Sequence, residues 1–257
     1  MVQDNFLPRQ VPLPTMYDLP SDNPEDPGVP DEFHISQPRL IDDTCQPPNL
    51  PPNQVFTAID LNLYYDARHP LWYKRPDWFL VLGTARARRQ QDLRLSYVTW
   101  QEVLVPFLVV ELLSPGTEAE DLGQTLREVN QPPTKWQVYE QLLRVPYYVV
   151  YDRYDNQFRA FRHVATRYET IALPNQRLWF EELQLGLGIW QGIYRDTEGA
   201  WLRWYDADGN WIPAPTEQVE QERQRAEAER QRAEAERQRA DRLAAQLRQL
   251  GINPDQF

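Results

Sequence analysis

Compact apolar runs of strand length divide the middle of the chain. They occupy residues 78–82, 107–113 and 147–151, and each ends close to a Gly, Pro or Asp. Runs without polar alternation are typical of strands that are covered on both faces of a sheet. Residues 134–144 have helical spacing, and residues 158–173 have the pattern of a β-hairpin. The sequence therefore predicts an α/β fold with a central mixed sheet.

Both ends of the chain differ from this middle part in composition. Residues 1–55 are rich in Pro and Asp, and Pro is disfavoured in helix interiors and sheet centres. We therefore expect a proline-rich acidic arm that is extended, and its recurring apolar side chains indicate that it packs on the core. The core domain is predicted to comprise residues 56–215, and residues 216–257 are predicted to form a charged helix.

The charged helix is predicted from a repeat. Two copies of the heptad AEAERQR, at residues 226–232 and 233–239, combine strong helix formers with a seven-residue period. In a coiled coil, the line of residues that faces the partner helix, here called the seam, would have Ala at three positions and Glu at three others. Glu disfavours tight pairing there. Two interpretations stay open, a solvated single helix and a coiled coil.

The charge of the chain is acidic and uneven. The formal net charge is −11, from 27 basic and 38 acidic residues. Residues 1–60 carry −8 of it, from ten acids and two arginines, whereas residues 61–216 carry only −2, from 19 acids and 17 bases. A polybasic nucleic-acid binder is therefore excluded, although a local basic groove is not.

The cysteine content and the apolar runs limit the compartment. Cys45 is the only cysteine, which excludes an intramolecular disulfide and a zinc site built from several thiolates. The first ten residues contain no basic stretch followed by an apolar one, and the longest apolar runs are far short of a membrane span. We therefore expect a cytoplasmic protein with no membrane partner.

Asp77, Glu111 and Lys135 form the strongest candidate site. Glu111 interrupts an apolar strand, where a carboxylate is costly to bury unless it is paired or binds a metal. Lys135, one of two lysines, lies on the apolar stripe of the helix that begins after Thr134, so it can reach Glu111. Asp77 precedes a strand. One interpretation is a half-buried structural ion pair with Asp77 as a turn residue, and the other is a one-metal hydrolytic site.

The hydrolytic interpretation assigns a role to each residue. Asp77 and Glu111 would supply the hard oxygen ligands that Mg²⁺ or Mn²⁺ requires. Lys135 would orient an attacking water or help to deprotonate it. The metal would stabilise the charge that builds on a phosphate in the transition state.

The order of these motifs resembles the Uma-type restriction endonuclease family, which belongs to the PD-(D/E)XK nuclease superfamily. The resemblance rests on Pro76-Asp77, on Val-Val-Glu-Leu-Leu-Ser-Pro at 109–115, on Lys135 with Tyr139, and on Val-Pro-Tyr-Tyr-Val-Val-Tyr-Asp at 145–152. It extends over roughly residues 15–215, and the proline-rich arm and the Ala/Glu/Arg tail are similar to one subgroup. It implies a restriction-endonuclease-like α/β/α core with a central mixed sheet.

The resemblance also implies site residues. Asp77 and Glu111 match the acidic metal ligands of the family. The superfamily places a lysine two residues after the glutamate, where this chain has Leu113, and related families carry that lysine on the following helix, as Lys135 would. The upstream acidic residue of the family is not matched by a single position, and Glu32 and Asp60 are both candidates.

The function that the resemblance implies is Mg²⁺-dependent endonucleolytic hydrolysis of phosphodiester bonds in DNA, with a possible homodimer formed through the folded domain. A set of basic residues near the first motif strand either lines a phosphate-binding rim or forms a solvated loop: Lys74, Arg75, Arg86, Arg88, Arg89 and Arg94. The alternative class is a non-catalytic scaffold that binds partners through the C-terminal helix.

Overall fold

The structure, a computed structural model, describes residues 13–19, 31–114, 118–125 and 131–249. The chain forms two compact units, Met1–Ile212 and Pro213–Phe257.

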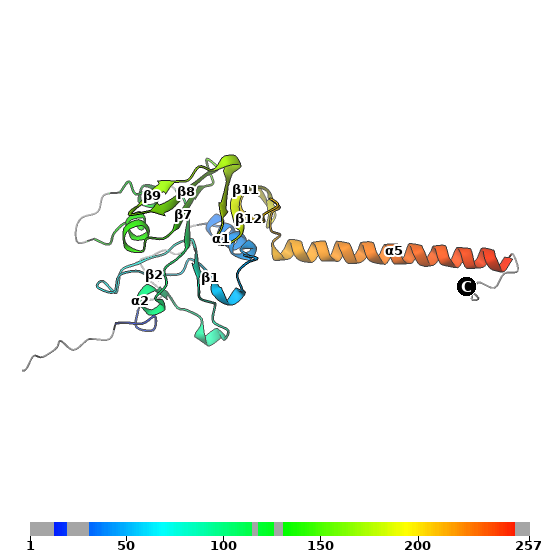
Figure 1. The fold of residues 1–257 in the computed structure, drawn as a ribbon, viewed down its shortest axis with the longest axis horizontal. Coiled ribbons are helices and arrows are strands. Elements are labelled where there is room, and N and C mark those ends of the chain that lie inside the picture. Colours follow the sequence, from blue (N-terminus) through cyan, green and yellow to red (C-terminus); the bar gives the residue numbers. More distant parts are fainter. Residues whose placement is uncertain (1–12, 20–30, 115–117, 126–130, 250–257) are drawn as a thin grey trace, which may run out of the picture. The chain divides into compact units, whose positions relative to one another are not determined.

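The larger unit is built on a six-stranded sheet with the strand order β1-β4-β6-β7-β8-β9 (Figure 1). The strands are β1 (Val55–Ile59), β4 (Trp78–Leu82), β6 (Leu108–Leu112), β7 (Tyr147–Asp152), β8 (Gln157–Val164) and β9 (Arg167–Thr170). β6 and β7 are parallel, and the other neighbouring strands are antiparallel. The predicted central mixed sheet, its three apolar strands and the hairpin are therefore confirmed.

Two three-stranded sheets and several short helices complete this unit. One sheet has the order β3-β2-β5 and the other β10-β11-β12. Their strands are β2 (Leu63–Tyr64), β3 (Tyr73–Lys74), β5 (Tyr97–Val98), β10 (Arg177–Phe180), β11 (Leu185–Tyr194) and β12 (Thr197–Tyr205). The helices are α1 (Phe33–Thr44), α2 (Thr99–Glu102), α3 (Glu118–Asp121) and α4 (Lys135–Gln137), with 3-10 turns at Pro52–Gln54, Gln90–Asp92 and Pro174–Gln176.

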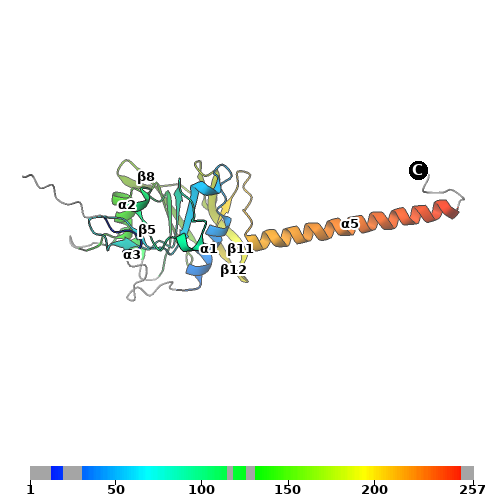
Figure 2. The same cartoon turned by 90° about the horizontal axis from the view of Figure 1, so that it is seen from below.

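The two faces of the large sheet bury different core layers. Trp78 and Val110 pack in a layer with Ile41 of α1 and with the β10–β12 sheet, which Figure 2 shows beside α1. Phe79 and Val109, their neighbours in sequence, pack in the other layer, with residues of β2, of β5 and of the segment after α4. Coverage on both faces explains why these strands are apolar without alternation.

Residues 33–44 form helix α1, so the prediction of an extended arm is wrong for this segment. Pro38 lies inside the helix, where a proline costs roughly 3 kcal/mol. Leu40 and Ile41 are fully buried, and burying two such side chains offsets a cost of that size. Asp31 adds a cap by accepting hydrogen bonds from the backbone N–H groups of Phe33 and His34.

The C-terminal unit contains one long helix, α5 (Pro215–Gln249), as the repeat predicted. Gln–Glu hydrogen bonds recur along it with the seven-residue period, at Gln224–Glu220, Gln231–Glu227 and Gln238–Glu234. No helix in the part of the chain that the structure describes is long and apolar enough to span a membrane.

Candidate active site

Glu111 lies in β6 and has no exposed surface. Two side chains of the helical segment at 134–142 donate hydrogen bonds to it. Lys135 Nζ donates to Glu111 Oε2 at 2.9 Å, and the Tyr139 hydroxyl donates to Oε1 at 2.8 Å. Lys135 and Tyr139 are four residues apart, which places them on one face of the helical segment. The structure thus brings the predicted carboxylate and the predicted lysine into direct contact.

The helical segment begins with a complete capping box. The Thr134 hydroxyl accepts from the backbone N–H of Gln137 at 3.2 Å, and the Gln137 side chain accepts from the N–H of Thr134 at 2.9 Å. A π-helical turn at Val138–Leu142 follows, in place of the regular helix that the spacing predicted. Such turns often occur at functional sites, because the extra residue re-aims neighbouring side chains.

Asp77 joins the cluster through the register of β4 and β6. Trp78 pairs with Val110, so Asp77 lies beside Glu111. The Asp77 carboxylate accepts from the Leu112 N–H at 2.7 Å, and the Asp77 N–H donates to Glu111 Oε2 at 3.4 Å. All three site residues that the sequence predicted are therefore adjacent.

A third carboxylate, Asp121 of α3, also belongs to the cluster. Its Oδ1 lies 3.3 Å from Lys135 Nζ, and the side chain is 1% exposed. The sequence alone did not mark Asp121, because Glu118, Glu120 and Asp121 form one acidic run in which no residue stands out.

The two candidates for the upstream acidic residue lie in different surroundings. Asp60 forms an ion pair with Arg75 at 2.9 Å, and Glu32 is exposed at the start of α1. The α1 side chain that reaches the end of β6 is His34, whose Nε2 lies 3.2 Å from the Leu112 carbonyl oxygen. No pattern in the sequence marked His34, because the three histidines are far apart.

Burial and mutual repulsion shift the ionisation of the two carboxyl groups. Burial raises the pKa of Glu111 to about 7. The positive charge of Lys135 opposes this rise without cancelling it, and the negative charge of the nearby Asp77 adds to it. Burial also raises the pKa of Asp77. Burial alone would lower the pKa of Lys135, but Glu111, Asp121 and Asp77 together raise it well above its ordinary value.

The donor set fits a hard divalent cation. Three carboxylates surround one ammonium group, so the fully ionised cluster has an excess of two negative charges that a divalent cation would compensate. Among the described residues, no three His, Cys, Asp or Glu side chains are arranged as a metal site. Two carboxylates with water completing the shell are the ligands that Mg²⁺ commonly uses. Asp77 and Glu111 are the pair that would hold it.

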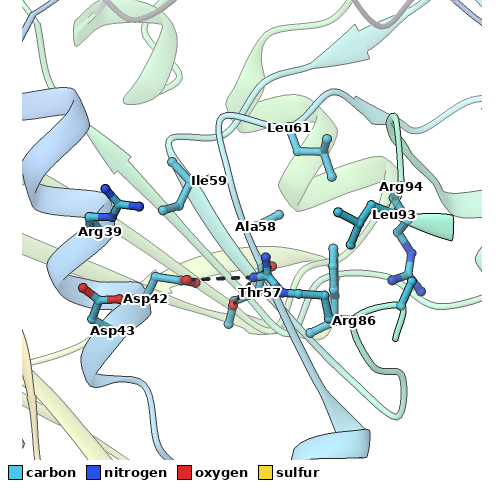
Figure 3. A pocket seen from close by; sticks show the side chains of 12 residues that line it. Arg39, Asp42, Asp43, Thr57, Ala58, Ile59, Leu61, Arg86, Leu93 and Arg94 are labelled. Atoms are coloured by element: carbon cyan, nitrogen blue, oxygen red, sulfur yellow. Dashed lines mark hydrogen bonds and ion pairs between the residues drawn. The ribbon is translucent and has the colours of Figure 1, made fainter. Parts of the chain in front are cut away.

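A cavity of about 330 Å³ lies beside β1, apart from this cluster (Figure 3). Its lining includes Arg39, Arg86 and Arg94 together with Asp42 and Asp43, but none of the residues of the acidic cluster. Arg86 turns toward Asp42 at 3.9 Å, as Figure 3 shows. Most basic side chains of the predicted rim form ion pairs with carboxylates. The pairs are Lys74–Glu120, Arg75–Asp60, Arg89–Asp92 and Arg94–Glu102.

A mixed sheet with an acidic pair near the end of β6, approached by a lysine from the helical segment at 134–142, is consistent with a restriction-endonuclease-like fold. The profile of the Uma2 family, described as putative restriction endonuclease, matches residues 15–197. The match covers more than half of the chain, so the chain belongs to this family. Membership indicates a nuclease that acts on nucleic acid. No curated protein is significantly similar to the chain.

Proposed function

We propose that this protein is a Mg²⁺-dependent endonuclease that hydrolyses phosphodiester bonds in DNA. The observation that supports this most directly is the cluster of Asp77, Glu111 and Lys135, in which Lys135 Nζ lies 2.9 Å from Glu111 Oε2. Membership of a restriction endonuclease family supports DNA as the nucleic acid.

Asp77 and Glu111 would hold the cation, which when bound supplies Lewis-acid stabilisation of the charge on the phosphate. Each carboxylate is oriented by a neutral donor of the protein. The Leu112 N–H holds Asp77 and the Tyr139 hydroxyl holds Glu111. Carboxylate oxygens have several lone pairs, so these hydrogen bonds leave sites for a cation.

Lys135 acts as a donor in this proposal. Its raised pKa means that it keeps its proton at neutral pH, so it is unsuited to remove a proton from water. An ammonium group can instead hold the attacking water, or a phosphate oxygen, by donating a hydrogen bond. Asp121 and Glu111 fix Lys135 from two sides, which limits the side-chain entropy lost when it does so.

The test is a cleavage assay on supercoiled, linear duplex and single-stranded DNA, with Mg²⁺, Mn²⁺ or chelator. We expect cleavage by the wild type that requires the cation and is abolished in Glu111→Ala. Glu169→Ala, which changes an exposed glutamate of β9, is the matched control and should cleave normally. The competing hypothesis, a non-catalytic scaffold, predicts no cleavage of any DNA form by the wild type.

Cation binding is tested separately from cleavage. If Asp77 and Glu111 are ligands, Mg²⁺ or Mn²⁺ should raise the melting temperature of the wild type by mass action. Asp77→Asn should remove this shift, because the amide keeps the shape of the side chain but loses its charge. A shift that persists unchanged in Asp77→Asn would contradict the assignment.

A further inference from the structure

The backbone of Leu112 connects two side chains that approach the end of β6 from opposite faces of the sheet. Its N–H donates to Asp77 Oδ2 at 2.7 Å, and its carbonyl oxygen lies 3.2 Å from His34 Nε2. A carbonyl oxygen only accepts, so this contact is a hydrogen bond when Nε2 carries a proton. His34 belongs to α1, which packs in one core layer, whereas Tyr139 and the acidic cluster lie in the other.

The ring of His34 is held on its other side as well. Nδ1 lies 2.9 Å from Asp31 Oδ1, and Arg153 donates to Asp31 Oδ2 at 2.7 Å. His34 is 4% exposed and packs edge-on against Phe33. Burial alone would raise the pKa of Asp31, but hydrogen bonds from His34 and Arg153 lower it to about 2, so Asp31 is a carboxylate at neutral pH. A buried ring with a polar partner beside each nitrogen is a rigid support for the Leu112 carbonyl.

We propose that His34 is a positioning residue of the candidate active site: by holding the Leu112 carbonyl it fixes the backbone of β6 at Leu112, so that the N–H of the same residue orients the Asp77 carboxylate. The proposal rests on the proposed function only where Asp77 is taken as a cation ligand. Groups that orient a ligand in this way typically change metal affinity tenfold to a hundredfold when they are removed, as an order-of-magnitude guide.

Ser114 offers a different interpretation of the same contacts. Its Oγ lies 3.1 Å from His34 Nε2, so Asp31, His34 and Ser114 are connected in the order of a nucleophilic triad. Two observations disfavour that interpretation. The Leu112 carbonyl oxygen, which only accepts, lies 3.2 Å from Nε2 and favours a proton on that nitrogen, which then cannot take the serine proton, and the charge of Asp31 is shared with Arg153.

Two amide substitutions separate the two contacts of His34. The amide nitrogen of His34→Gln can take the place of Nε2 and donate to Leu112, whereas the shorter His34→Asn reaches only the place of Nδ1. In chelator, hydrogen exchange of the Leu112 N–H, followed by NMR, should be about tenfold faster in His34→Asn than in the wild type. It should be near the wild-type rate in His34→Gln. The Ala160 N–H in β8 reports global opening and should be unchanged in both variants.

Mn²⁺ titration by calorimetry then tests the consequence for Asp77. We expect the affinity to fall about tenfold or more in His34→Asn, and to stay within about twofold of the wild type in His34→Gln and Ser114→Ala. Equal exchange at Leu112 in the Gln and Asn variants would overturn the proposal, as would a loss in Ser114→Ala equal to that in His34→Asn. If the wild type binds no Mn²⁺ while the exchange pattern is as expected, the proposed function fails and the positioning role of His34 is supported.

Discussion

At the scale of single residues, Glu111 sets the charge of the site. It has no contact with solvent, and burial together with Asp77 raises its pKa to about 7 against the opposing charge of Lys135. A divalent cation binds the ionised carboxylate, so the proton on Glu111 competes with the cation. The cation affinity that we propose for this site should therefore depend on pH near neutrality.

The same pKa shift predicts how stability depends on pH. The pKa of Glu111 is about 7 in the folded protein and 4.5 in the unfolded chain, so between these values the folded state holds a proton that the unfolded state has lost. Without metal, the free energy of unfolding should therefore fall as the pH rises from 4.5 to about 7. The slope should be at most about 1.4 kcal/mol per pH unit.

Urea denaturation in chelator, compared between the wild type and Glu111→Gln, measures this effect. The amide cannot ionise, so the free energy of unfolding of the variant should not show this fall. The difference between the variant and the wild type should therefore shift in favour of the variant as the pH rises through that range. A stability difference that stays constant over the whole range would show that the pKa of Glu111 is not raised.

Lys135→Met removes the ammonium group and keeps a similar side-chain stem. We expect turnover on DNA to fall by about 100-fold or more with little change in KM, because the lost hydrogen bond acts on the reacting atoms. Stability should also fall, since Glu111 and Asp121 are buried and would lose their cation. Steady-state kinetics and melting curves report the two effects, with Arg167→Met as the exposed control. Full activity at normal stability would exclude both roles.

The residues of the site differ in how far the sequence revealed them. Glu111 and Lys135 were predictable because each is a charge at a position where the periodicity demands an apolar residue. Tyr139 lay on the predicted apolar stripe, and the need of a buried hydroxyl for a partner was a usable signal. Asp121 and His34 reach the site only through tertiary packing, which no local pattern encodes.

At the scale of elements, the short helical segment at 134–142 does most to shape the site. The capping box fixes where the helix begins. The π-helical turn after Gln137 contains Tyr139 and changes the direction of its side chain from that in a regular helix. The strands were predictable from runs of apolar residues. Helix α1 was not, because the cost of Pro38 is offset by the burial of Leu40 and Ile41, which depends on the sheet beneath them.

Removing the cap tests the role of this segment. Thr134→Ala should lower the free energy of unfolding by about 1 kcal/mol, because the N–H of Gln137 loses the acceptor that the buried Thr134 side chain supplies. Thr134→Ser keeps the hydroxyl and should retain most of that stability. Urea denaturation at fixed pH measures both variants. Equal losses in Ala and Ser would point to the lost methyl group rather than to the cap.

At the scale of the whole molecule, the core fold was predictable because two independent signals agreed. The alternation of strand and helix patterns indicated an α/β fold, and the order of motifs resembled the restriction-endonuclease-like family that the profile match identifies. The β10–β12 sheet that helps to cover one face was not predicted. Its strands pair with their neighbours in the sequence, β10 with β11 and β11 with β12, but the residues of α1 and of the large sheet that they cover are far away in the sequence.

The tail helix has little surface suited to pairing. Ala226, Ala233 and Ala240 in its candidate seam are exposed and would bury small areas, at roughly 25 cal/mol per Å². Glu would occupy three of the remaining seam positions, where burial is penalised. Leu243 is 51% exposed, and the Leu247 side chain and Leu250 lie outside the described residues. The ion pairs on its surface contribute only a few tenths of a kcal/mol each.

We therefore expect any stable dimer to be held by the folded domain and not by α5. A chain truncated after Pro215 should keep the mass of the full-length protein's oligomer, less the missing residues, when both are measured by light scattering at the same concentrations. Raising the salt concentration should weaken the helical circular dichroism signal of the full-length protein slightly, because screening weakens its surface pairs. A full-length dimer that becomes monomeric on truncation would show that the helix is the pairing element, since the seam would then bind more strongly than its Ala and Glu positions allow.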